Sequence, residues 1–286
     1  MSQKLSVLAL LVSLLALFMV WTHPADYAAP KHKETAFERV MRTNTLRCGY
    51  IVYPPGLIKD LNTGKMSGIS YDIMTRLGRD LGFKIVWTEE VGTVSMIEGL
   101  ETGRYDLVCT SVWAESGRGK RALFTTPLYF TEINAYARSG DSRFKDRLAS
   151  LNDPKNKIAT IDGGLAAVIA RQDFPKAQTY SLPELTDFSD LFLGVTSRKA
   201  DVTFSEPAQI VAFDTTHPQA LQNLSPNHPV RLFPNAFMVA MGEDKLAAML
   251  NNAILNLQYN GEIDTIIKSY EQTPHEYRRV ALPIQP

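Results

Sequence analysis

The chain has 286 residues, of which 45% are hydrophobic and 21% are charged, a composition that is typical of a globular protein and excludes a disordered one. Lys and Arg together number 30, as do Asp and Glu, so the formal net charge is zero. A neutral chain without a basic run gives no electrostatic reason to expect nucleic acid as a partner.

The N-terminus predicts export from the cytoplasm. Lys4 is followed by an uninterrupted apolar run over residues 5–21, LSVLALLVSLLALFMVW. This length falls between the apolar core of a signal peptide, about 7–15 residues, and a membrane span of about 20. We therefore expect residues 1–22 to be either a cleaved signal peptide or an anchor in the inner membrane, and residues 23–37 to be a polar linker. Either alternative places the rest of the chain in the periplasm or elsewhere outside the cytoplasm.

After the linker, short apolar runs alternate with amphipathic ones. Strands are predicted over residues 46–53, 84–90 and 105–112. Between them, Ile69, Ile73, Leu77 and Leu81 recur every four residues, which indicates a helix over 67–83, and a shorter helix is predicted over 94–103. Strands that alternate with helices in this way favour a mostly parallel sheet with right-handed crossovers.

A second unit repeats this alternation. Its predicted strands are 157–161, 201–205 and 237–242, and its predicted helices follow Gly164, span 189–200, begin at Pro207 and span 244–261. Two α/β units of about 100 residues suggest two lobes. Ligands bind at the carboxyl ends of the strands of such sheets, so a cleft between the lobes is the expected ligand site.

The two cysteines, Cys48 and Cys109, could pair in an oxidising compartment. Both lie in apolar strand-like segments where buried free cysteines are common, so we favour free thiols, although sequence alone does not give the distance between their Cα atoms. The cysteines have no zinc-type spacing and the five histidines are scattered, so neither a metal nor another cofactor is expected.

Six blocks in this order and spacing resemble bacterial extracellular solute-binding proteins of family 3, the periplasmic amino-acid-binding proteins of ABC transporters. The resemblance covers about residues 38–272. The blocks are LRCGY, GISYDIMTRLGRDLGFKIVW, MIEGLETGRYDLVCTSV, SGRGKRALFTTPLYF, SRKADVTFSEPA and KLAAMLNNAILNLQYNGEIDTIIKSYE.

The resemblance implies a two-lobed α/β fold of the type II periplasmic-binding class, in which the chain crosses between the lobes twice. We expect lobe 1 to comprise residues 38–132 and 237–272, lobe 2 residues 133–236, and a C-terminal tail residues 273–286. It also implies capture of a small carboxylate-bearing ligand, an amino acid or a relative of one, for delivery to an ABC-type permease in the inner membrane.

In the family, hydroxyl residues at a strand end and a following arginine grip the α-carboxylate of the ligand. Thr110, Ser111, Trp113 and Arg118 occupy these positions here. A guanidinium fork suits a carboxylate because it donates two parallel charge-assisted hydrogen bonds. Trp113 departs from the family, which has a small hydroxyl residue in its place.

The resemblance assigns further contacts. Gly164 and Leu165 stand where the family has Ser-Thr at a helix start, so backbone donors remain while two hydroxyls are lost. Glu206 matches the acidic residue that pairs with the ligand ammonium, and Tyr53 matches an aromatic residue that stacks on the ligand. Tyr50 stands where the family often has a polar or acidic residue.

Two other functions remain open at this point. Cyclohexadienyl dehydratases resemble the same family, and Glu206 could serve such an enzyme as a general acid if its pKa were raised. A membrane-tethered sensor is the second alternative, if residues 5–21 are retained. We assign no catalytic residues and expect a binding protein.

Overall fold

The structure, a computed structural model, describes residues 12–15, 18, 33–145, 147–272 and 276–280. The chain divides into two units, Met1–Glu34 and Thr35–Pro286. In the first unit, residues 12–15 and 18 are helical, and the rest of the predicted signal or anchor lies outside the described residues. Among the residues that are described, no helix is long and apolar enough to cross a membrane.

The second unit begins with the helix α2 (Ala36–Thr43), which starts inside the predicted linker. The side chain of Thr35 accepts a hydrogen bond from the backbone of Glu38, whose carboxylate in turn bonds the backbone of Thr35. This reciprocal capping box satisfies two free N–H groups and fixes the start of the helix.

Lobe 1 contains the predicted parallel strands β1 (Thr45–Tyr50), β4 (Lys84–Glu90) and β5 (Leu107–Trp113) in the order β4-β1-β5. The helix α3 (Ile69–Leu81) buries Ile69, Ile73 and Leu77 against this sheet, as their spacing predicts, and ends at Gly82 in the left-handed conformation. The remaining elements of lobe 1 are α4 (Met96–Glu101), α8 (Asp244–Tyr259), α9 (Glu262–Tyr270), β2 (Ile58–Lys59), β3 (Met66–Ser67), β6 (Ala122–Phe124) and the 3₁₀ turn η1 (Arg118–Lys120).

Cys48 and Cys109 form a disulfide, so the expectation of free thiols is wrong. The two residues lie on the paired strands β1 and β5, and their Cα atoms are 5.4 Å apart. Strand pairing, which sequence alone does not reveal, brings them within the range that a disulfide spans.

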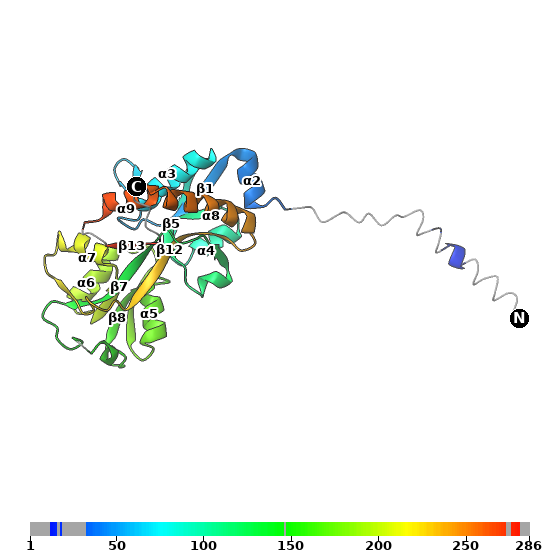
Figure 1. Cartoon of the computed structure of the whole chain (residues 1–286). Coiled ribbons are helices and arrows are strands. Elements are labelled where there is room, and N and C mark those ends of the chain that lie inside the picture. Colours follow the sequence, from blue (N-terminus) through cyan, green and yellow to red (C-terminus); the bar gives the residue numbers. More distant parts are fainter. Residues whose placement is uncertain (1–11, 16–17, 19–32, 146, 273–275, 281–286) are drawn as a thin grey trace, which may run out of the picture. The chain divides into compact units, whose positions relative to one another are not determined.

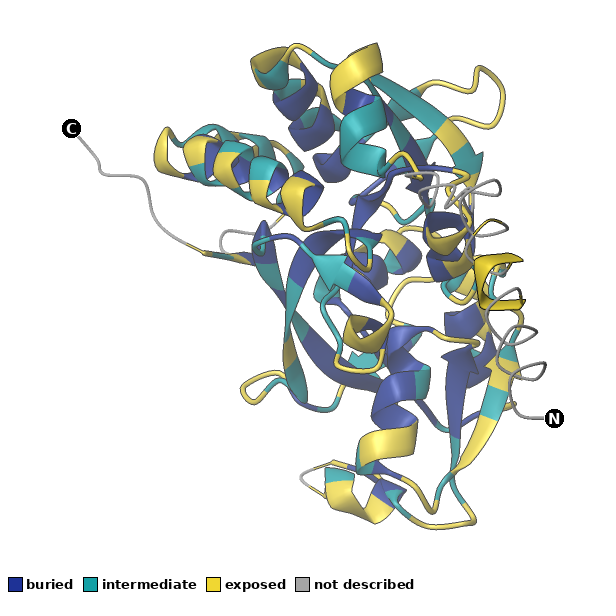
Figure 2. Cartoon of the chain, turned by 90° about the vertical axis from the view of Figure 1, so that its right-hand side faces the viewer, coloured by how far each residue is buried: buried dark blue, intermediate teal, exposed yellow. Residues whose placement is uncertain are grey.

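Lobe 2 is built in the same manner. Parallel strands β8 (Lys157–Ile161), β9 (Gln178–Leu182) and β10 (Val202–Ser205) are followed or covered by α5 (Leu165–Asp173), α6 (Phe188–Thr196) and α7 (Pro207–Asp214). The 3₁₀ turn η2 (Leu148–Leu151) and the strand β11 (Leu221–Asn223) complete the lobe. Figure 2 shows the buried residues gathered on the strands and on the inward faces of the helices.

Two long strands join the lobes. The strand β7 (Tyr129–Arg138) pairs with β12 (Arg231–Ala240) over residues 129–133 and with β10 over residues 134–137. Figure 1 shows β7 and β12 running from the part that holds α3, α8 and α9 to the part that holds α5, α6 and α7. The predicted lobe boundaries, 132/133 and 236/237, fall within these strands, and the division there stays a prediction.

The predicted C-terminal tail contains structure. Residues Tyr277–Arg279 form the strand β13, which pairs antiparallel with Tyr129–Thr131 at the start of β7. Tyr277 is buried and its ring meets that of Tyr129 edge-on, with centroids 5.3 Å apart. The tail therefore adds a strand to the sheet at the point where the lobes join.

Candidate functional site

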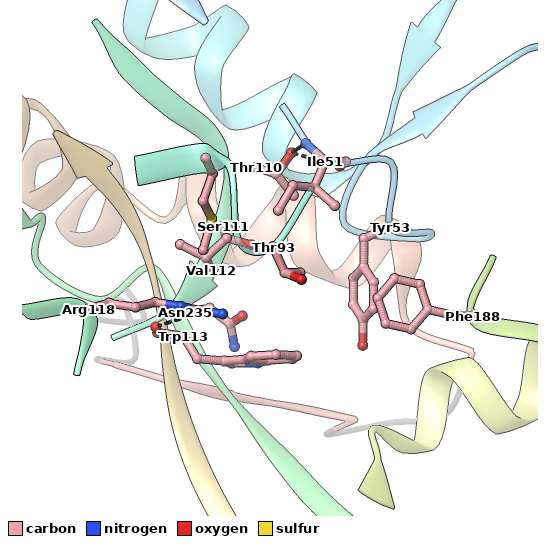
Figure 3. Close-up of a pocket in the computed structure, with 11 residues that line it drawn as sticks. Ile51, Tyr53, Thr93, Thr110, Ser111, Val112, Trp113, Arg118, Phe188 and Asn235 are labelled. Atoms are coloured by element: carbon pink, nitrogen blue, oxygen red, sulfur yellow. Dashed lines mark hydrogen bonds between the residues drawn. The ribbon is translucent and has the colours of Figure 1, made fainter. Parts of the chain in front are cut away.

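A small cavity lies where the carboxyl end of β5 faces lobe 2. Its volume is about 30 Å³, and it is lined by Ile51, Tyr53, Thr93, Met96, Thr110, Ser111, Val112, Trp113, Arg118, Phe188 and Asn235 (Figure 3). Five of the predicted site residues are therefore brought together. Ligand pockets typically measure about 300–1,000 Å³, so a ligand can enter only when the surrounding side chains or the lobes move apart.

A second, smaller cavity of about 10 Å³ adjoins the first and shares three of its residues, Tyr53, Trp113 and Phe188. Gly164 and Leu165 line this cavity from the start of α5. Leu165 is also part of the apolar core of lobe 2. The preceding Gly163 has a φ of 68°, and a Cβ there would lie 2.7 Å from a methyl carbon of Val94, so only glycine allows this approach between the lobes.

Arg118 is only 9% exposed, and its guanidinium crosses to lobe 2. Nη2 donates to the carbonyl oxygen of Gly163 at 2.9 Å, and Nη1 donates to that of Trp113 at 3.4 Å. Glu115 is nearby, but its carboxylate accepts the backbone N–H groups of Gly117 and Arg118. Burial lowers the pKa of Arg118 to about 10, so the guanidinium is still charged at neutral pH.

The hydroxyls expected to bind the ligand are already hydrogen-bonded within lobe 1. Thr110 Oγ1 donates to the carbonyl of Ile51 at 2.8 Å and accepts its N–H at 2.9 Å. Ser111 Oγ lies 2.8 Å from the hydroxyl of Tyr129 and 3.3 Å from that of Ser70. These two hydroxyls fix neighbouring segments to the end of β5, and they are not free donors in this structure.

Glu206 lies beside the cavity and is 4% exposed. Its Oε1 accepts hydrogen bonds from Thr131 Oγ1 at 3.0 Å and from the indole Nε1 of Trp113 at 3.2 Å, and Tyr53 adds a third hydrogen bond. Burial raises the pKa of Glu206 to about 7, although the three hydrogen bonds oppose this shift. Glu206 precedes Pro207 at the start of α7 but makes no capping bond to that helix.

Aromatic rings from both lobes meet at the cavity. The rings of Tyr53 and Phe188 lie 4.6 Å apart at 80°, and those of Tyr53 and Trp113 lie 6.3 Å apart at 87°. Such edge-to-face arrangements are favourable because the positive edge of one ring meets the negative face of the other. The ring of Trp113 also packs near that of Phe233 on β12, with the ring centroids 6.1 Å apart.

Tyr50 lines neither cavity. Its hydroxyl accepts a hydrogen bond from Lys59 Nζ at 3.2 Å, and its ring meets that of Trp87 edge-on at 5.8 Å. Tyr50 is the last residue of β1, and the segment that follows it supplies Ile51 and Tyr53 to the cavity. The geometry gives the predicted binding role of Tyr50 no support.

Several residues that line the cavity or contact Glu206 were missed from the sequence. Phe188 follows the capping residue Asp187 at the start of α6, where nothing in its pattern distinguishes it from a core residue. Thr131 and Asn235 lie on the joining strands, whose approximate position was predicted, and Asn235 Nδ2 donates to Thr131 Oγ1 at 3.0 Å. No group of His, Cys, Asp or Glu within the described residues is placed to hold a metal ion.

The structure has two α/β lobes that face a cleft and are joined by long strands. A buried arginine and a buried carboxylate lie between the lobes. This arrangement defines a small-molecule binding protein. The family model of bacterial extracellular solute-binding proteins, family 3, matches residues 46–273, and the chain belongs to this family.

Two curated relatives are each 24% identical to the chain. One, from Haemophilus influenzae, is named a probable amino-acid ABC transporter-binding protein and is matched over 93% of this chain and 96% of its own length. The other, from Campylobacter jejuni, is named a probable histidine-binding protein, with 92% and 97% covered.

Among solved structures, an ancestral amino-acid-binding protein described as a precursor of cyclohexadienyl dehydratase has a TM-score of 0.69 at 22% identity. The match covers 83% of this chain and 99% of that one. The predicted two-lobed type II periplasmic-binding fold is thereby confirmed.

Proposed function

We propose that this protein captures a small carboxylate-bearing ligand, an amino acid or a relative of one, outside the cytoplasm and delivers it to an ABC-type permease. The family and the names of both curated relatives support this function. The observation that carries the ligand class is Arg118. Within the described residues, its buried guanidinium bonds only two backbone carbonyls.

A buried charge is costly unless it is paired and hydrogen-bonded. Neutral carbonyl oxygens satisfy two of the donors of Arg118 but supply no opposite charge. A ligand carboxylate placed in the cavity would provide that charge and accept two parallel bonds from the fork. Arg118 also contacts lobe 2, so ligand binding and closure of the lobes would use the same side chain.

The experiment compares wild type with Arg118→Ala by isothermal titration calorimetry against a panel of amino acids. Two charged hydrogen bonds are worth about 3–6 kcal/mol together, so the variant should lose affinity by about 100-fold or more. Arg121→Ala is the matched control, because Arg121 pairs with Glu101 on the surface nearby. Circular dichroism checks that both variants fold. An Arg118→Ala protein that keeps wild-type affinity would refute the site.

The dehydratase alternative is not favoured, since both curated relatives are named as binding proteins. The raised pKa of Glu206 is what an enzyme would need, but burial and, to a smaller extent, the negative charge of Glu276 account for it. We expect no turnover of prephenate or arogenate by the purified protein. Whether residues 1–22 are cleaved, or retained as a tether as the sensor alternative requires, is decided by N-terminal sequencing of the exported protein.

A further inference from the structure

Three aromatic side chains line the cavity together with Arg118. In Figure 3 Arg118 lies at one end, Tyr53 and Phe188 stand together at the other, and the indole of Trp113 lies between them, beside the amide of Asn235. The ring of Tyr53 is nearly perpendicular to both of the others, at 80° and 87°. The rings thus present differently oriented surfaces to a single space.

Few hydrogen-bond acceptors remain in this space. Thr110 and Ser111 are bonded within lobe 1, and Thr93 Oγ1 donates to the carbonyl of Asp162 at 2.5 Å. Glu206 already receives three hydrogen bonds. The amide oxygen of Asn235 is bonded by none of the described residues. A primary ammonium carries three N–H donors, and each donor left unpaired in a dry site weakens binding.

The sequence also indicates that few hydrogen-bond acceptors face the ligand. Trp113 stands where the family resembled has a small hydroxyl residue, and Gly164-Leu165 stand where it has Ser-Thr. At these three positions the family has hydroxyls that could accept hydrogen bonds from N–H groups, whereas this chain has an aromatic residue, a glycine and an apolar residue. Trp113 is also fixed in place, because its indole N–H donates to the buried carboxylate of Glu206 at 3.2 Å.

We infer that the ligand is a carboxylate whose nitrogen is N-methylated, a betaine-type solute held by Arg118 at its carboxylate and by the faces of Tyr53, Trp113 and Phe188 around its cation. Aromatic faces attract quaternary ammonium groups through the ring quadrupole, most strongly at Trp, and methyl groups need no acceptors. The inference rests on the proposed function, because it uses the same carboxylate clamp.

The three aromatic rings around the proposed cation, here called the aromatic cage, come from both lobes. Tyr53 and Trp113 come from lobe 1 and Phe188 from lobe 2, and the present cavity of about 30 Å³ is too small for the ligand. Parting of the lobes would separate Phe188 from Tyr53 and admit the solute. Closure would then bring the third ring onto the methylated nitrogen.

The test is calorimetry of the exported protein with two matched series that keep the carboxylate constant. The first is glycine, N-methylglycine, N,N-dimethylglycine and trimethylglycine, and the second is L-proline and N,N-dimethyl-L-proline. We expect the dissociation constant to fall with each methyl group, and the fully methylated member to bind at least about tenfold more tightly than the primary or secondary amine. Equal or tighter binding of the unmethylated members, or no binding in either series, overturns the inference.

Trp113→Thr restores a hydroxyl and removes the indole face. It should reverse the order, with about a tenfold loss for trimethylglycine, and should remove the upfield shift of the bound methyl protons in NMR spectra. If that variant does not fold, Phe188→Leu tests the cage from the other lobe. Tyr259→Leu, which removes a 67% exposed ring on α8, is the control and should change neither series.

The two proposals fail in different ways. If Arg118→Ala abolishes binding of unmethylated amino acids and no methylated probe binds, the carboxylate clamp stands and the cage is wrong. If trimethylglycine binds Arg118→Ala as tightly as wild type, the clamp is wrong while recognition by the rings stands.

Discussion

The fold changes the ionisation of Glu206 near neutral pH. Burial raises its pKa from the ordinary 4.5 to about 7, so the native chain holds this proton more tightly than the unfolded chain does. The stability that the protonated group contributes is fully present below about pH 4.5 and is lost as the pH rises through about 7. Deprotonation leaves a carboxylate that is hydrogen-bonded but forms no ion pair with any of the described residues.

Glu206→Gln should remove this pH dependence while keeping an acceptor for Trp113 and Thr131. Between pH 4.5 and pH 8, the free energy of unfolding of wild type should fall relative to the variant by up to about 3 kcal/mol. Urea denaturation at both pH values measures the difference. Glu101→Gln, at an exposed ion pair, is the control and should follow wild type over this range. A Glu206→Gln curve parallel to wild type would show that Glu206 titrates normally.

At the scale of elements, the disulfide fastens β1 to β5, the two strands whose ends carry the site. Cys48 and Cys109 are separated by 61 residues, so their link closes a long loop in the unfolded chain. The chain-entropy estimate for such a loop is about 4 kcal/mol, and removal of native disulfides commonly costs about 2–5 kcal/mol.

The double variant Cys48→Ala/Cys109→Ala should therefore unfold at a lower denaturant concentration, by about 2–5 kcal/mol in free energy. Wild type treated with a reductant is the companion measurement, because it removes the link without deleting the side chains. Stability that is unchanged in both samples would contradict a structural role for the disulfide.

The periodicity of the sequence predicted individual helices and strands well, but it did not predict which strands lie side by side. The four-residue spacing of Ile69, Ile73 and Leu77 identified the buried face of α3, and Pro207 marked the start of α7. The disulfide and the strand β13 depend on which strands lie side by side, a contact that local spacing does not encode. Thr110 and Ser111 illustrate the same limit at the site, because a sequence motif gives a hydroxyl but not whether another residue already bonds it.

At the scale of the whole molecule, direct contacts hold the two lobes together around the cavity. Besides Arg118 and Trp113, Gln209 donates to the carbonyl of Pro54 across the cleft. Glu184, from the loop after β9, accepts the backbone N–H groups of Val94 at 2.8 Å and Ser95 at 3.1 Å, at the start of α4. A carboxylate of lobe 2 thus bonds the turn that leads into α4 of lobe 1, and these hydrogen bonds exist only while the lobes are closed.

Glu184→Ala should shift the unliganded protein toward an open form, because the closed form alone loses these hydrogen bonds to a charged group, each worth about 1.5–3 kcal/mol. Small-angle X-ray scattering should then give a larger radius of gyration than for wild type. Asp187→Ala is the matched control, because Asp187 caps α6 within its own lobe through the N–H of Ser189. That variant should lower stability without changing the scattering. Identical scattering of wild type and Glu184→Ala would mean that Glu184 does not hold the lobes closed.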